Sequence, residues 1–147
     1  MRSRDCAMPA SSPEGLQGAV ERLYTALGGG DGDVVMGLLA PTFEGRIADG
    51  MPAGAGTHHG PTSMLRDGWW AIGRAFKVVA EPESWVPCAD GRLLVAGTYR
   101  GVVRGTDVRV NARFAHLWSG GSGGLTALEQ WTDTALWRAA LDESARR

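Results

Sequence analysis

The sequence predicts an α+β fold in which a curved, mainly antiparallel sheet wraps around N-terminal helices. Amphipathic helical segments come first, four strand-like runs follow one another in the second half, and short turn-like connectors join these runs. Successive hairpins produce an antiparallel sheet with helices on one face. A length of 147 residues suits one domain, which we place at residues 11–147 after a disordered tail over residues 1–10.

The first helix is indicated by a start signal and by apolar residues at helical spacing. Ser11 with Glu14 fits a capping box, and Pro13 suits the first helical turn. The expected buried stripe consists of Leu16, Val20, Leu23, Tyr24 and Leu27. Gly28-Gly29-Gly30 should end this helix, because glycine adopts the left-handed C-terminal conformation at low cost.

A short helix, a short strand and a loop are predicted next. The helix covers Val34–Leu39 and is capped by Asp31 or Asp33. Phe43–Ala48 forms the strand, and the glycine-rich stretch Asp49–Gly60 forms the loop.

A third helix precedes the sheet strands. Pro61 opens this helix, whose buried stripe is predicted to be Met64, Leu65, Trp69, Ile72 and Phe76. The four strand-like runs are Lys77–Val86, Leu93–Val103, Val108–Trp118 and Leu125–Thr132. A final helix is expected over Thr134–Ser144.

Charge and cysteine content argue against several classes of function. With 15 basic and 16 acidic residues, we expect neither a nucleic-acid nor a membrane partner. Lys77 is the only lysine. Cys6 and Cys88 do not form a disulfide framework, and the chain has neither a secretory signal nor an apolar run that could span a membrane. We therefore expect a cytoplasmic protein.

Three segments resemble the nuclear transport factor 2-like superfamily, within it the SnoaL-like polyketide cyclases. The helix LQGAVERLYTAL resembles that of ketosteroid isomerases, while GMPAGAGTHHGP with the Trp-rich helix after it, and the ending GLTALEQWTDTALWRAAL, resemble the SnoaL-like group. The resemblance covers about Pro13 to Leu141. It implies a cone-shaped, ketosteroid isomerase-like α+β barrel and a homodimer that pairs through convex sheet faces. The isomerases' helix tyrosine falls at Leu23, one place before Tyr24, and their hydrogen-bond-donating acid falls near Ala115.

The resemblance implies an enzyme of secondary metabolism, such as antibiotic biosynthesis. It would be a cyclase or isomerase that needs no cofactor and acts by general acid–base catalysis on a hydrophobic, polyketide-type intermediate in a closed pocket. Two alternatives stay open. The first is an epoxide hydrolase-like enzyme in which Asp133 activates water. The second is a non-catalytic module that binds a small ligand.

Three residues are the catalytic candidates. Asp133 ends the last strand, where desolvation would raise its carboxyl pKa for a general base, or it caps the final helix. His116 shares a strand face with Phe114 and Trp118, and it either shuttles a proton or sits in the core. Asp49 falls where the isomerases have their general base, or it belongs to an Asp-Gly turn.

The residues predicted to bind substrate are Arg113, Gln130, Trp69, Trp118, His59 and Tyr24. Arg113 or Gln130 would hold a developing oxyanion. Arg113 lies on the strand face opposite His116, so it points inward only if a bulge intervenes, and otherwise makes a surface or dimer contact. His58 and His59 are adjacent and point to opposite sides of an extended segment, so a zinc site is not expected.

Overall fold

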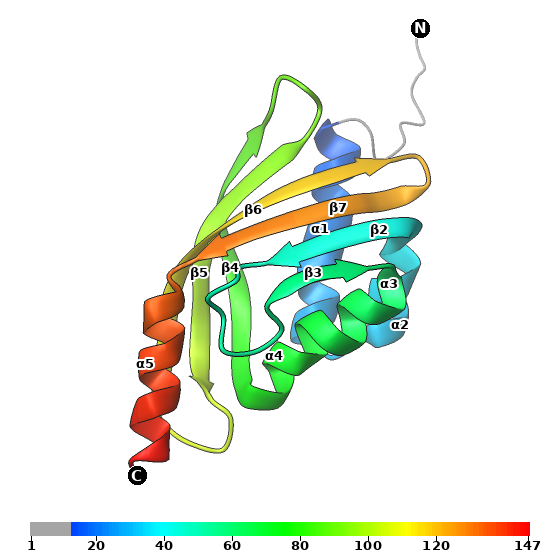
Figure 1. The fold of residues 1–147 in the computed structure, drawn as a ribbon. Helices are drawn as coiled ribbons and strands as arrows, with labels where there is room; N and C mark the ends of the chain where they lie inside the picture. The colour runs from blue at the N-terminus through cyan, green and yellow to red at the C-terminus, as the bar shows by residue number, and fades with distance from the viewer. Residues whose placement is uncertain (1–12) are drawn as a thin grey trace, which may run out of the picture.

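The structure is a computed structural model that describes residues 13–147 (Figure 1). Its helical segments are α1 Pro13–Gly28, α2 Gly32–Leu38, α3 Pro61–Ser63, the π-helix η1 Met64–Trp69, α4 Trp70–Ala75 and α5 Thr134–Ala145. Its strands are β2 Leu39–Ile47, β3 Gly56–His59, β4 Phe76–Pro87, β5 Leu93–Val103, β6 Arg109–Gly121 and β7 Gly124–Thr132.

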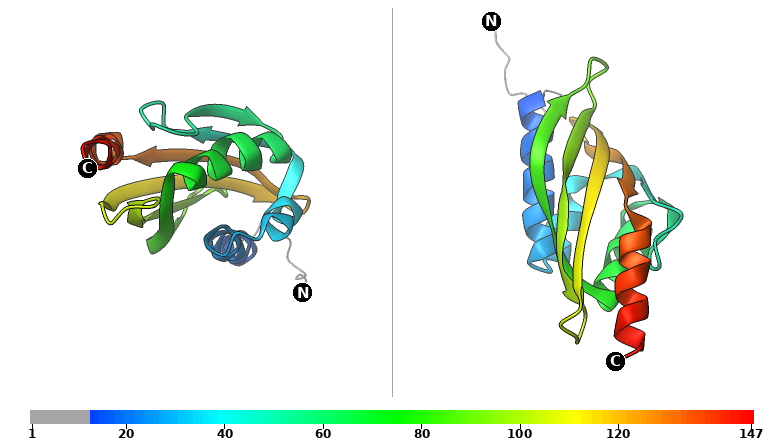
Figure 2. Two further views of the ribbon diagram at one scale, coloured as in Figure 1. Left: turned by 90° about the horizontal axis from the view of Figure 1, so that it is seen from below. Right: turned by 90° about the vertical axis from the view of Figure 1, so that its left-hand side faces the viewer.

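The strands form one six-stranded sheet in the order β3-β2-β7-β6-β5-β4. Among the described strands, only β2 and β7 pair in parallel, and the other four pairs are antiparallel. The sheet curves around helices on its concave side but does not close, because β3 and β4 lie at opposite edges (Figure 2). The predicted α+β class and the cone-shaped, mainly antiparallel sheet around N-terminal helices are confirmed, and the sheet is open.

Helix α1 lies on the concave face of the sheet because one of its faces is apolar. Leu16, Val20 and Leu23 recur at helical spacing and are completely buried. Burial of a side chain of this size contributes about 1.5–3 kcal/mol to folding. The position after Leu23 is rotated by about 100° around the helix, so Tyr24 leaves this core stripe and faces the space between α1 and the sheet.

Strand β6 alternates strictly between the two faces of the sheet. Its inner residues, all buried, are Val110, Ala112, Phe114, His116 and Trp118. Its outer neighbours Arg109, Asn111 and Arg113 are exposed. The period of two residues thus directs His116 toward the helices and Arg113 toward solvent. The sequence predicted that these two residues lie on opposite faces of the strand.

A π-helical turn interrupts the helix that begins at Pro61. The Trp70 N–H donates to the Leu65 carbonyl, five residues back, where an α-helix would use the fourth. The wider turn brings both Trp69 and Trp70 to the concave side, where both line the cavity described below.

Three local expectations differ from the structure. The segment predicted as a loop contains strand β3, which pairs with β2. Phe76 is buried, but it starts strand β4 and does not belong to a helical stripe. The helix capped by Asp31 ends at Leu38, so β2 begins earlier than expected. The predicted tail and the Ser11 capping box lie outside the described residues.

Candidate active site

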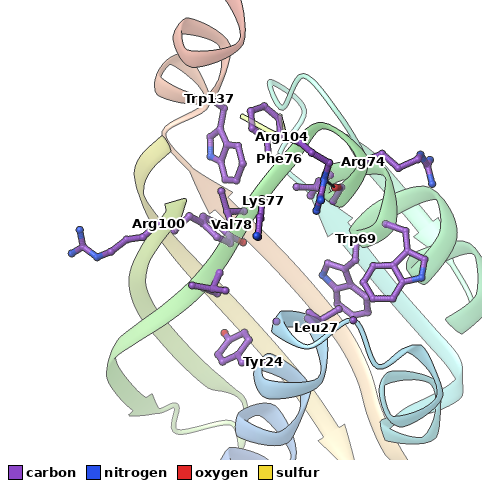
Figure 3. A pocket seen from close by; sticks show the side chains of 18 of the residues that line it. Tyr24, Leu27, Trp69, Arg74, Phe76, Lys77, Val78, Arg100, Arg104 and Trp137 are labelled. Carbon is purple, nitrogen blue, oxygen red and sulfur yellow. Dashed lines mark hydrogen bonds between the residues drawn. The ribbon is translucent and has the colours of Figure 1, made fainter. Parts of the chain in front are cut away.

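A cavity of about 900 Å³ opens between the helices and the concave face of the sheet (Figure 3). Its aromatic lining residues are Tyr24, Trp69, Trp70, Phe76, Tyr99, Trp118 and Trp137, with His116 among them. Tyr24 and Trp137 lie toward opposite ends of the cavity in Figure 3. A cavity of this volume with a mainly apolar wall suits a small organic ligand.

His116 is the centre of a hydrogen-bonded chain on the wall of this cavity. Its Nδ1 lies 2.7 Å from the hydroxyl oxygen of Tyr24, and its Nε2 lies 2.7 Å from the hydroxyl oxygen of Tyr99. Both distances are at the short end for hydrogen bonds between nitrogen and oxygen. The imidazole therefore bridges two phenols, and all three rings line the cavity.

Each tyrosine hydroxyl also accepts a hydrogen bond from a second side chain. The Trp118 indole N–H donates to Tyr24 at 3.2 Å, and Gln130 Nε2 donates to Tyr99 at 2.7 Å. Gln130 Oε1 accepts from the backbone N–H of Ala48 at 3.2 Å. Because a backbone N–H can only donate, the amide oxygen of Gln130 must face Ala48, and its NH₂ group must face Tyr99.

The register of the sheet brings these groups together. His116 on β6 is the direct cross-strand partner of Gln130 on β7, and both side chains are only 4% exposed. Tyr99 projects from β5 on the same inner face and reaches His116 and Gln130. Tyr24 reaches the histidine from α1, across 92 residues of sequence.

Burial keeps all three rings of the chain neutral. Desolvation lowers the pKa of His116 to about 3, since a buried imidazolium would lose its hydration. Desolvation likewise raises the pKa of Tyr24 and that of Tyr99 above the ordinary range of a phenol. The hydrogen bonds from Trp118 and Gln130 oppose these two shifts but are smaller effects.

Five of the residues predicted from the sequence meet at this site. Four of them line the cavity: Tyr24, Trp69, His116 and Trp118. Gln130 joins them through Tyr99. Leu23, where the isomerase tyrosine falls by resemblance, is completely buried in the core, and the neighbouring tyrosine faces the cavity.

The two candidate aspartates do not line this cavity. Asp133 is exposed and caps α5, where its carboxylate accepts from the Leu136 N–H at 3.4 Å. Asp49 is also exposed, and its carboxylate lies 2.8 Å from Arg46 Nη2. The structure therefore gives Asp133 its capping role and pairs Asp49 with an arginine, and neither carboxylate reaches the wall of the cavity.

Arg113 and His59 also lie away from the cavity. Arg113 is on the outer face of β6, with its Nη2 3.3 Å from Glu83 Oε1. His59 is exposed, with its Nδ1 3.7 Å from Glu44 Oε1. Both residues are surface groups in this structure, which corresponds to the alternative stated above for Arg113.

Tyr99 and Trp137 were not among the candidates from the sequence. Tyr99 is one of only two tyrosines, and period two along β5 places it on the buried face with Val95. That alternation is a signal that could have found it. Trp137 is fully buried, packs edge to face on Phe76 at 4.9 Å between ring centroids, and reaches the cavity from α5.

Within residues 13–147, no group of three or more His, Cys, Asp or Glu side chains is arranged to hold a metal ion. No helix in the same range is long and apolar enough to cross a membrane.

No protein-family model matches the chain, and no curated protein matches it in sequence. Solved structures do match. An NTF2-like protein from Burkholderia thailandensis is 26% identical, with a TM-score of 0.75, over 88% of this chain and 97% of that one. TerC, co-crystallized with polyporic acid, is 21% identical, with a TM-score of 0.75, over 89% and 99%. A candidate polyketide cyclase from Xanthomonas campestris is 15% identical, with a TM-score of 0.71, over 85% and 95%.

These matches define the class of the protein. The chain has the NTF2-like fold, which is also the fold of ketosteroid isomerase-like proteins and includes candidate polyketide cyclases. The superfamily resemblance drawn from the sequence is confirmed at this level. Because one fold hosts many reactions, the function has to be argued from the site.

Proposed function

We propose that this protein is an isomerase or cyclase that needs no cofactor and moves protons on an apolar, carbonyl-bearing small molecule. The observation that carries the proposal is the Tyr24–His116–Tyr99 chain on the cavity wall. Neighbours with the same fold have been crystallized with small molecules, TerC with polyporic acid and a Catenulispora acidiphila protein with trimethylamine. Their likeness supports a small-molecule site, and the chemistry below is argued from this chain's own residues.

An account of the protons shows that one phenol hydrogen in the chain is uncommitted. A neutral imidazole has one N–H donor and one acceptor nitrogen, so it donates to one tyrosine and accepts from the other. The tyrosine oxygen that accepts the hydrogen bond from His116 also accepts one from Trp118, in the case of Tyr24, or from Gln130, in the case of Tyr99. Its own O–H then has no partner within the chain. Either tautomer of His116 therefore leaves one phenol, Tyr24 or Tyr99, with a hydrogen to donate to a ligand.

The chain can transfer a proton between two positions of one substrate without changing its net charge. In one direction, Tyr24 gives its O–H proton to a substrate carbonyl oxygen and takes the Nδ1 proton of His116. The Tyr99 O–H proton moves to Nε2, and Tyr99 takes a proton from a C–H next to the carbonyl. The substrate ends as its enol, every phenol is again protonated, and only the tautomer of His116 has changed.

The perturbed pKa values favour this neutral relay over a stepwise mechanism. Burial disfavours an imidazolium at His116 and a phenolate at either tyrosine. A concerted transfer avoids these charged states, because each group gains one proton as it loses another. The uncommitted O–H also supplies a preorganised donor for the developing oxyanion. This arrangement gives the tyrosines the base role that the sequence suggested for Asp133 or Asp49, and it keeps His116 as the proton shuttle.

The proposal is tested by exchange of carbon-bound hydrogen for deuterium. A panel of aromatic ketones and 1,3-diketones is incubated with the protein in D₂O, and loss of the proton next to the carbonyl is followed by ¹H NMR. General acid–base groups contribute about 10²–10⁴-fold, so Tyr24→Phe and Tyr99→Phe should each slow exchange by about 100-fold or more. Asp133→Asn and Asp49→Asn are the controls and should exchange at the wild-type rate.

Two results would contradict the proposal. Wild-type protein that binds panel members but never accelerates exchange would be a ligand-binding module. Exchange that survives Tyr99→Phe but is lost in Asp133→Asn would move the chemistry to the aspartate and support the hydrolase-like alternative.

A further inference from the structure

The charged residues that line the cavity all have the same sign. They are Arg74, Lys77, Arg100 and Arg104, and within residues 13–147 no aspartate or glutamate lines the cavity. The whole chain has a net charge of −1, so this local excess of cations does not follow from overall composition. His116 adds no charge at neutral pH. A cleft lined by charge of one sign concentrates ligands of the opposite sign.

Six arginines in the described residues are already paired with carboxylates. The arginines in ion pairs are Arg46, Arg66, Arg92, Arg100, Arg113 and Arg147. Of the cavity cations, only Arg100 is in this group; it binds Glu81 at 2.7 Å and extends away from the cavity in Figure 3. Within residues 13–147, Arg74, Lys77 and Arg104 have no ion pair. Their charge is therefore available to a ligand.

Lys77 and Arg104 are the best placed of these cations. Lys77 is the only lysine of the chain and directly follows the buried Phe76, the first residue of strand β4. Arg104 follows β5, and its Nε donates to the Gly73 carbonyl at 2.7 Å, which holds the guanidinium beside the α4–β4 junction. Figure 3 shows both side chains in the part of the cavity near Phe76. Both are exposed to solvent, so they mark the mouth, while the aromatic rings form the interior.

We infer that the cavity takes an anionic substrate, a molecule with an aromatic or polycyclic body and an acidic group that Lys77 and Arg104 hold at the mouth. The body would pack among the tryptophans, which direct a carbonyl toward Tyr24 or Tyr99. That the bound molecule is a substrate rests on the proposed function, whereas the preference of the cavity for a negatively charged ligand does not. A protein that only bound its ligand would have the same preference.

The test uses two fluorescent probes that differ by one acidic group. 8-Anilinonaphthalene-1-sulfonate carries a sulfonate, and N-phenyl-1-naphthylamine has the same rings without it. Competition between the two establishes that they share one site. Because exposed charge pairs contribute little, Lys77→Gln should weaken sulfonate binding by about threefold and leave the neutral probe unchanged. Raising the salt concentration should likewise weaken binding of the sulfonate alone.

Arg109→Gln is the matched control, because it removes one exposed cation from β6 that does not line the cavity. It should leave the affinity for both probes unchanged. Equal weakening of both probes by Lys77→Gln, no effect of Lys77→Gln on either, or equal effects of Lys77→Gln and Arg109→Gln would each overturn the inference. Tyr99→Phe should keep the preference for the sulfonate while losing exchange. A failure of the predicted charge preference can therefore be distinguished from a failure of the proposed catalytic function.

Discussion

Acid should destabilise this protein through His116, because folding buries the ring in its neutral form. The pKa of this histidine falls from 6.5 in the unfolded chain to about 3 in the folded protein. Between these values the unfolded state binds one more proton, so stability is fully present above the unfolded pKa and falls as the pH decreases. Each pH unit in this window costs about 1.4 kcal/mol. From about pH 7.5 to 4.5 the loss is about 3 kcal/mol.

The variant His116→Gln isolates this contribution. An amide offers one donor group and one acceptor, so it can still bridge the two tyrosines, but it does not titrate. Urea unfolding, followed by tryptophan fluorescence at a series of pH values, gives the free energy of unfolding of each protein. The carboxylates and the other histidines contribute equally to both curves. The free energy of unfolding of the wild type should therefore fall by about 3 kcal/mol more than that of the variant over the same pH range.

His59→Gln is a second control, because this histidine is 77% exposed. Its curve should follow the wild-type curve. Parallel curves for wild type and His116→Gln would refute the reasoning, since His116 would then take up its proton in the folded protein near its ordinary pKa. The neutral relay proposed above would lose its physical basis at the same time.

Three further predictions concern packing, capping and assembly. Gly101→Ala should lower the free energy of unfolding by about 1–3 kcal/mol, because a Cβ there would meet the Lys77 carbonyl of the neighbouring strand β4. Gly37→Ala should raise the free energy of unfolding by up to about 1 kcal/mol, because a Cβ on this helical residue meets no other atom. Urea unfolding measures both changes. Asp133→Ala should cost about 1 kcal/mol in the same assay through loss of the α5 cap, whereas Asp133→Asn should cost little. Sedimentation at micromolar concentration should show a homodimer. The variant Trp131→Arg should dissociate this dimer, because Trp131 is 47% exposed on β7. A wild-type monomer would contradict the expected assembly.

Much of the fold could be predicted because its signals are local. The stripe of Leu16, Val20 and Leu23, the glycines that end α1 and the alternation along β6 each report on one element, and the structure confirms them. Tyr24 and Leu27, which were expected in the same stripe, line the cavity instead. Strand β3 was missed because its four residues show no alternation and sit among glycines. Its partner β2 holds it in place, with the Gly60 N–H donating to the Phe43 carbonyl at 2.7 Å. Such pairing is a non-local property that a sequence window does not contain.

The site was predictable only in part, for a similar reason. His116 and Trp118 could be placed on one strand face from period two alone. The hydrogen bond between His116 and Tyr99 depends on the register between β5 and β6, which no local sequence pattern reveals. Asp133 remained ambiguous because a carboxylate between a strand and a helix suits both a general base and an N-cap. Only the backbone geometry, with the Leu136 N–H directed at the carboxylate, distinguishes the two.

The same hydrogen bonds that place the phenols also restrict which one can act. From Ala48 after β2, the chain passes through Gln130 on β7, Tyr99 on β5 and His116 on β6 to Tyr24 on α1. Because the first donor is a backbone N–H, the direction of the Gln130–Tyr99 bond is fixed by the fold. The two bonds of the imidazole can still reverse, and the tautomer of His116 decides which tyrosine donates to it. A ligand that accepts a hydrogen bond from Tyr24 must therefore select the Nδ1–H tautomer of His116, so ligand binding itself sets the direction in which the relay can move its first proton.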